Sequence, residues 1–277
     1  MDNSEWIEQG YAWTQSDLGV CYANGNGVTQ SYTKALKCFR EAAEKGDALA
    51  QFNLGLCYEE GKGVTQSYKE AVEWWLQAAN QGLAEAQVNL GFCYFKGKGV
   101  IQSFDEAVKW WQKAAEKGDM KAEYELGCCF MNGEGVTQSY HDAVKWWIKA
   151  AEKGHGHAQF NLGISYEDGK GVNQSYTESF KWYIKAAEQG HVQAQYNVGV
   201  FYYKGRGVLQ SYNEAVRWWQ KAAEKGLASA QFNLGLCYET GRGIKKSLTE
   251  AMKWYQLAAF QGHVNAQKRI LAIRKQG

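Results

Sequence analysis

Proline is absent from this chain of 277 residues, so its turns and helix ends have to be made by other residues. Long apolar runs are absent as well: no segment approaches the roughly 18 consecutive apolar residues that a membrane-spanning helix requires. The N-terminal segment lacks the basic stretch and following apolar run of a secretory signal. These absences predict a cytoplasmic protein that does not insert into a membrane.

Net charge is also scarce, because 31 lysines and arginines almost balance 29 aspartates and glutamates. A net charge of +2 creates no broad field that would draw nucleic acid or an anionic membrane to the whole surface. We therefore expect no nucleic-acid partner, and only a localised charged patch stays open.

The seven cysteines form no C-x-x-C pair and no zinc-type spacing. Five of them are separated by 36 residues or a multiple of 36: Cys21, Cys57, Cys93, Cys129 and Cys237. Equivalent positions of stacked helices lie roughly 10 Å apart, which exceeds the ~7 Å Cα separation that a disulfide tolerates. Buried, reduced thiols are therefore predicted, in agreement with a reducing compartment.

Glycine, by contrast, is abundant and periodic. Seven glycines advance in steps of 36 residues, namely Gly19, Gly55, Gly91, Gly127, Gly163, Gly199 and Gly235, and a G-x-G pair follows each of them. Every unit contains an apolar run of helical period, a glycine-rich break and a second helical run, which together form a helical hairpin. The sequence thus predicts an all-α solenoid of about seven helix-turn-helix repeats in one domain spanning residues 1–277. Residues 1–10 are expected to form a helix stub and residues 263–277 a capping helix.

One unit illustrates the pattern. Its first helix is predicted over residues 48–60, and its second helix is expected to open with a capping box of Ser67 and Glu70. The adjacent Trp74 and Trp75 recur as an aromatic pair in later units, and neighbours on a helix diverge by about 100°. One ring is therefore expected to pack within the hairpin and the other between hairpins.

The repeated pattern A-x-A-Q-F-N-L-G-x-x-Y…G-x-G-V…A-x-x-W-W-x-x-A-A-E-x-G resembles the Sel-like repeat (SLR) family, which is related to tetratricopeptide repeats. The resemblance covers residues 11–271. It implies a right-handed superhelix of paired helices whose first helices line a concave groove, and a role as an adaptor that assembles protein complexes.

Two sets of residues are candidates for ligand binding in that groove. An asparagine stands two residues before the first-helix glycine in five units, as Asn53, Asn89, Asn161, Asn197 and Asn233, and Glu125 replaces it once. Similarity to peptide-binding tetratricopeptide repeats implies that these amides hold a ligand backbone, since an amide both donates and accepts. The alternative is that they bond the backbone of a neighbouring repeat.

The second set lies near the end of the first helix, where the repeats differ most. Similarity to tetratricopeptide repeats implies that these positions lie on the concave face, with Phe95, Met131 and Tyr203 as exposed apolar anchors beside Lys96 and Lys204. Such pairs suit an extended peptide or a partner helix. The alternative is tolerated surface variation.

When the repeats are aligned with one another, the residues of apparent catalytic and metal motifs occupy positions that serve the fold. Ser31 and Lys34 match the S-x-x-K motif of serine enzymes that act on penicillins, but Ser31 occupies the helix-capping position of its unit. His155 and His157 stand at the start of a first helix, where other units have aspartate, so a helix-start role is favoured over a metal site. We expect no catalytic residues, no metal and no cofactor.

A row of cations fills the centre of the G-x-G breaks: Lys62, Lys98, Lys170, Arg206 and Arg242. Such a row suits an acidic partner, although exposed loop lysines are usually solvated and Glu134 interrupts the row.

The sequence favours a non-catalytic scaffold or adaptor that binds a protein or peptide in the groove. Two alternatives stay open. One is a hydrolase acting on β-lactam-like amides, which some disulfide-rich members of the resembled family suggest. The other is a purely structural spacer in a larger complex.

Overall fold

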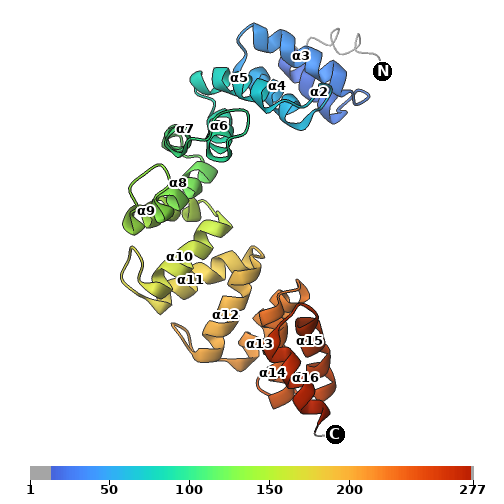
Figure 1. Cartoon of the computed structure of the whole chain (residues 1–277), viewed down its shortest axis with the longest axis vertical. Coiled ribbons are helices and arrows are strands. Elements are labelled where there is room, and N and C mark those ends of the chain that lie inside the picture. The colour runs from blue at the N-terminus through green and yellow to red at the C-terminus, as the bar shows by residue number, and fades with distance from the viewer. Residues whose placement is uncertain (1–13, 276–277) are drawn as a thin grey trace. The chain divides into compact units, whose positions relative to one another are not determined.

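A computed structural model describes residues 14–275, and within that range the chain consists of fifteen α-helices and no strand (Figure 1). Their bounds are α2 Gln15–Asn24, α3 Tyr32–Glu44, α4 Ala48–Glu60, α5 Tyr68–Asn80, α6 Ala84–Lys96, α7 Phe104–Glu116, α8 Met120–Asn132, α9 Tyr140–Glu152, α10 Gly156–Asp168, α11 Tyr176–Glu188, α12 Val192–Lys204, α13 Tyr212–Glu224, α14 Ala228–Thr240, α15 Leu248–Phe260 and α16 Val264–Arg274. The predicted all-α architecture of helix-turn-helix repeats is confirmed. The helix stub expected over residues 1–10 lies outside the described residues.

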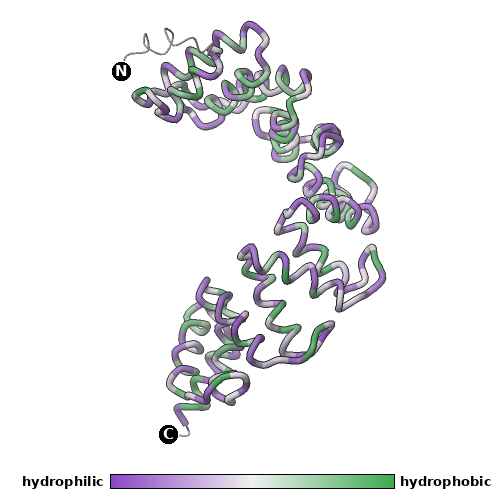
Figure 2. The backbone as a smooth tube through the Cα atoms, turned by 180° about the vertical axis from the view of Figure 1, so that it is seen from behind, coloured by the Kyte–Doolittle hydropathy of each residue, from purple (hydrophilic) through white to green (hydrophobic). Residues whose placement is uncertain are grey.

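The helices belong to two compact units, residues 1–138 and residues 139–277. Within each unit, successive helices pack as antiparallel neighbours joined by short loops. Hydrophobic and hydrophilic residues alternate along the helices (Figure 2). The buried apolar residues of neighbouring helices form clusters inside each unit. The helix expected over residues 263–277 is α16, whose Ala266, Ile270 and Ile273 pack against α15.

Local chemistry sets the helix ends. Helix α4 starts after Asp47, whose carboxylate accepts the amide of Ala50 at 2.6 Å, and it ends at Gly61 with φ of 70°. Its observed range is the predicted one. The capping box expected at Ser67 is only half formed. The Ser67 hydroxyl accepts the Glu70 amide at 3.3 Å, but the Ser67 amide donates to the Tyr58 carbonyl instead of to Glu70.

The two glycines of a G-x-G break have different structural roles, as Gly61 and Gly63 show. Gly61 adopts the left-handed conformation that ends α4, with φ of 70°. Gly63 also has a positive φ, of 73°, and a Cβ there would lie 2.6 Å from the carbonyl oxygen of Tyr32 in the preceding hairpin. The second glycine therefore both turns the chain and lets the loop approach the neighbouring repeat.

The aromatic pair packs as predicted. The second ring lies inside the hairpin: Trp75 is 1% exposed, faces Gly55 and donates from Nε1 to the Phe52 carbonyl at 3.1 Å. The first ring packs between hairpins: Trp110 joins a cluster of α6 in its own hairpin with α5 of the preceding one, and Trp218 joins a cluster of α12 with α11 in the same way. The pair thus stabilises both the hairpin and the stack.

Glutamines at two positions of most repeats hold backbone carbonyls, a role that the sequence pattern does not indicate. Gln51, buried on α4, donates to the Ala43 carbonyl at 3.1 Å, and Gln87, Gln159, Gln195 and Gln231 make the equivalent bond. Gln66 braces the loop by donating to the Glu59 carbonyl at 2.7 Å. The Gln51 bond is a second one for the Ala43 carbonyl, which also accepts the amide of Gly46 at 3.0 Å, and both glutamines tie their side chains to the carbonyl end of a helix.

The seven cysteines are free thiols, as predicted. Burial raises the pKa of the Cys57 and Cys237 thiols to about 11 and that of Cys93 and Cys129 to about 12. A thiol with such a pKa is a poor nucleophile at neutral pH, so these side chains act as small apolar groups of the core.

Candidate functional site

The five asparagines of the first helices form a set of half-buried amides, which we call the amide row. Among residues 14–275, the side chains of Asn53, Asn89, Asn161 and Asn233 make no hydrogen bond within the protein. The side chain of Asn197 hydrogen-bonds the Tyr183 hydroxyl. The alternative for these asparagines was a bond to the backbone of a neighbouring repeat. The glutamine two residues before each of them makes that bond instead, by donating to a carbonyl of the preceding helix. The row therefore offers donors and acceptors that the fold itself leaves unused.

The apolar residues near the first-helix ends are less exposed than predicted. Phe95 is half-buried, with its ring 5.1 Å from Phe104 and 5.5 Å from Trp111. Tyr203 is placed in the same way, 5.1 Å from Tyr212 and 5.3 Å from Trp219. These rings extend the aromatic packing of their own hairpins, which leaves them half-buried.

Met131 is half-buried as well, whereas Lys96 and Lys204 are exposed. The Lys96 ammonium lies 5.1 Å from the centre of the Phe95 ring. A cation therefore lies beside an apolar ring at the end of this helix, as expected.

The identity of the residue near the first-helix end is linked to the second ring of the aromatic pair. In two hairpins that ring is tyrosine, and its hydroxyl donates to a glutamate at this position: Tyr183 to Glu167 at 2.9 Å, and Tyr255 to Glu239 at 2.5 Å. In three hairpins the ring is tryptophan and its Nε1 bonds a backbone carbonyl, as in Trp75, Trp111 and Trp219, whereas the buried Nε1 of Trp147 has no hydrogen-bond partner. Two of the glutamates at this position, Glu167 and Glu239, thus have a role in the core, whereas Glu59 occurs in a hairpin whose ring is Trp75.

A double-mutant cycle tests this link. Trp219→Tyr is expected to destabilise unit 139–277 by about 2 kcal/mol, because it removes the bond to the Tyr196 carbonyl and leaves a phenol without an acceptor. Adding Tyr203→Glu recreates the arrangement of Tyr183 and should recover about 1 kcal/mol. Urea denaturation of both single variants and the double variant measures the coupling. Strictly additive effects would contradict the proposed pairing.

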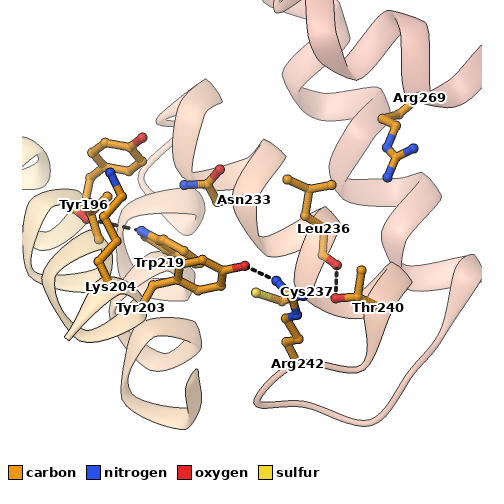
Figure 3. A pocket seen from close by; sticks show the side chains of 11 residues that line it. Tyr196, Tyr203, Lys204, Trp219, Asn233, Leu236, Cys237, Thr240, Arg242 and Arg269 are labelled. Atoms are coloured by element: carbon orange, nitrogen blue, oxygen red, sulfur yellow. Dashed lines mark hydrogen bonds between the residues drawn. The ribbon is translucent and has the colours of Figure 1, made fainter. Parts of the chain in front are cut away.

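In unit 139–277 the structure brings three of the predicted binding residues to one cavity of about 440 Å³ (Figure 3). The residues that line it include Val200, Tyr203 and Lys204 on α12, Asn233 on α14, Arg242 in the following loop and Arg269 on α16. We call it the cationic cavity. The volume lies in the range typical of ligand sites. The sequence places Arg242 in the row of loop cations but does not predict that it meets Lys204 and Arg269 at one cavity.

Most of the loop cations expected to form a row are neutralised locally. Lys62 pairs with Glu60 at 2.5 Å, Lys170 with Asp168 at 3.2 Å, and Arg206 with Glu167 at 3.7 Å. Arg242 instead donates to the Tyr203 hydroxyl at 2.5 Å, a neutral partner. Lys98 likewise contacts a tyrosine, with its ammonium 3.5 Å from the Tyr68 hydroxyl, so the row is uneven and Arg242 is the member that keeps its charge at the cationic cavity.

Glu125, which replaces asparagine in the amide row on α8, has an altered acidity. Burial raises the pKa of its carboxyl to about 7, and Lys96 opposes the shift. The carboxyl is thus partly protonated near neutral pH, when it can both donate and accept a hydrogen bond, as the asparagine amides do.

The histidines at helix starts are caps. The Nδ1 atoms of His155 and His191 accept the amides of Ala158 and Ala194 at 3.2 Å. His157 lies with its Nδ1 3.3 Å from Nε2 of His191. Since the capping Nδ1 must stay unprotonated, the proton of neutral His191 sits on Nε2, which disfavours a metal there. The described part of the chain has no cluster of three or more His, Cys, Asp or Glu side chains that would suit a metal ion.

None of the helices in residues 14–275 combines the length and the apolar character needed to cross a membrane.

The Sel1 repeat family matches seven consecutive segments: residues 14–47, 48–83, 84–119, 121–155, 156–191, 192–227 and 228–263. No curated protein is significantly similar to the chain.

Two solved structures are similar in sequence and fold. The first is c5321, a protective antigen present in uropathogenic Escherichia coli strains and displaying an SLR fold, which is 38% identical with a TM-score of 0.95. The match covers 99% of this chain but only 59% of that protein, so the chain spans about three fifths of its length. The second is a Sel1 repeat protein from Oxalobacter formigenes, 31% identical with a TM-score of 0.74, covering 89% of this chain and 97% of that one. Seven matched segments with the internal architecture described above establish that the chain belongs to the Sel1 repeat family.

Proposed function

We propose that the chain is a non-catalytic scaffold that binds a protein or peptide along the first-helix faces of its repeats. Sel1 repeat proteins are generally scaffolds for protein–protein interaction. The observation that supports this use most directly is the amide row, because half-buried amides without internal partners are suited to pairing with an extended backbone.

The hydrolase alternative has no support. The Ser31 hydroxyl accepts the Lys34 amide at 3.4 Å as the cap of α3, and the Lys34 ammonium lies 5.2 Å from the centre of the Tyr22 ring. This arrangement employs both residues in the fold rather than as a nucleophile and its base.

Peptide selection tests the proposal. Twelve-residue peptides from a random phage-displayed library are selected on the whole chain, and their affinities are measured by fluorescence anisotropy. The triple variant Asn161→Ala, Asn197→Ala, Asn233→Ala is expected to bind the selected peptides at least tenfold more weakly. One lost hydrogen bond is worth about 1 kcal/mol, so a tenfold effect requires little more than one bond.

The chain offers a matched control in the same unit. Asn173, Asn213 and Asn265 are exposed and lie outside the amide row, so their joint change to alanine should leave the affinity unchanged. Circular dichroism of both triple variants checks the helices. Failure to select any peptide, or equal binding by the two triple variants, would refute the proposed binding surface.

A further inference from the structure

Three cations from three separate elements converge on the cationic cavity: Lys204 at the end of α12, Arg242 in the loop after α14, and Arg269 on α16 (Figure 3). Within residues 14–275, neither Lys204 nor Arg242 has a carboxylate within ion-pair distance. Arg269 lies 3.4 Å from Glu239, a mostly buried carboxylate that also accepts the Tyr255 hydroxyl. The cavity therefore keeps an excess of positive charge after internal pairing.

The remainder of the lining is apolar or amide. Val200, Trp219 and Leu236 contribute carbon surface, and Asn233 adds an amide of the amide row with no partner in the described protein. Apolar surface beside guanidinium groups favours a ligand that alternates carboxylates with an apolar side chain. The Asn233 amide is placed for the backbone of such a ligand.

The distribution of charged residues along the chain also favours an acidic ligand. Residues 1–138 carry 12 lysines and arginines against 19 aspartates and glutamates, whereas residues 139–277 carry 19 against 10. Within the second set, residues 192–277 alone hold 13 basic against 4 acidic residues. The near-zero net charge of the whole chain therefore conceals a strongly basic segment that surrounds the cavity and would steer an acidic partner toward it.

The residue at the amide-row position also changes from acidic to basic along the chain. Its occupant is Asp17 on α2, Glu125 on α8 and Arg269 on α16, with asparagine in the units between them. Arg269 thus takes the place of an amide at the end of the row. A guanidinium there exchanges a group that pairs with the peptide backbone for one that pairs with a carboxylate.

We propose that the cationic cavity binds an acidic peptide segment of a partner protein. Carboxylates of the segment pair with Arg242, Arg269 and Lys204, and an adjacent apolar side chain packs on Trp219 and Leu236. This inference rests on the proposed scaffold function and names the class of ligand for one part of its surface.

The peptide selection described above distinguishes this inference from the general function. Peptides selected on the whole chain are expected to be enriched in aspartate and glutamate beside an aromatic residue or leucine. Replacing each acidic residue of one selected peptide by its amide should weaken binding at least tenfold. Selection of peptides with no acidic enrichment would overturn the inference while leaving the scaffold function standing. No selection at all would count against both.

Charge reversal localises the ligand. The variant Lys204→Glu, Arg242→Glu, Arg269→Glu should lower the affinity for the acidic peptide at least a hundredfold. The control Lys245→Glu, Lys246→Glu, Lys275→Glu makes the same change of charge at exposed residues outside the cavity and should cost less than threefold. Equal losses in the two variants would show that only the overall field matters and would reject the cavity as the site.

Two further measurements guard the interpretation. Lys204→Gln with Arg242→Gln leaves the Arg269–Glu239 pair intact, so a tenfold loss there with an unchanged melting temperature excludes unfolding as the cause. Sedimentation of the free chain tests whether the acidic residues 1–138 of a second copy fill the cavity instead. Self-association that the triple reversal abolishes, with no binding of acidic peptides, would overturn the proposal.

Discussion

Gly91→Ala is expected to lower the free energy of unfolding by about 2 kcal/mol. The added Cβ overlaps the indole of Trp111, which is fully buried and donates from Nε1 to the Val88 carbonyl at 3.2 Å. The ring has no free volume to enter, so it must leave its hydrogen bond or push α6 and α7 apart. Overpacking of this kind costs about 3 kcal/mol, and the higher helix propensity of alanine returns about 1 kcal/mol.

Gly156→Ala supplies the matched control, because Gly156 also lies in a first helix but has open space around its Cα. The nearest atom to its Cβ would be Oε1 of Gln189 at 3.8 Å, and its φ is negative. This variant should gain about 0.5–1 kcal/mol. Urea denaturation followed by circular dichroism measures both. Equal destabilisation by the two changes would mean that the glycines serve only the backbone and not the approach of the ring.

Glu125→Gln is expected to stabilise the protein by about 2 kcal/mol more at pH 8 than at pH 5. The pKa of the Glu125 carboxyl is raised by burial to about 7, against an ordinary value of 4.5. Between these two values the folded state binds more protons than the unfolded state, so stability falls as pH rises through this window. Above pH 7 the full penalty of the buried charge is present, and glutamine removes it.

The difference between variant and wild type at each pH isolates this carboxyl from other titrating groups. Lys96→Gln provides a second check: since Lys96 opposes the shift, its loss should raise the pKa of Glu125 further and enlarge the penalty at pH 8. A Glu125→Gln effect that is independent of pH would show that the carboxyl is charged at both values and that burial does not perturb it.

Much of the fold could be predicted because the repeats align with one another inside a single chain. The step of 36 residues located the packing glycines, the helix bounds of α4 and the opposed roles of Trp74 and Trp75. It also assigned Ser31 to a helix cap. These predictions succeeded because they depend on local propensity and on neighbours that recur at a fixed interval.

The candidate site was less predictable. The half-formed capping box at Ser67 depended on a carbonyl of the preceding helix, that of Tyr58, which the sequence does not place near it. Phe95 and Tyr203 were expected to be exposed, but rings from the second helix cover them. Sequence periodicity identifies which face a residue occupies. It does not identify which side chain from another element reaches across to cover it.

The sequence by itself thus determined the repeat, the hairpin and the aromatic core, because the residues that form each of them recur at a fixed spacing along the chain. Tertiary structure decided which polar groups remain available. It gave the backbone-bonding role to glutamines such as Gln51 and left four of the five asparagines of the amide row without a hydrogen bond among the described residues. It also brought Lys204, Arg242 and Arg269 together from positions that do not match in the internal alignment. Convergence of that kind depends on the path of the chain in space, since residues from three different elements meet only when the helices have packed.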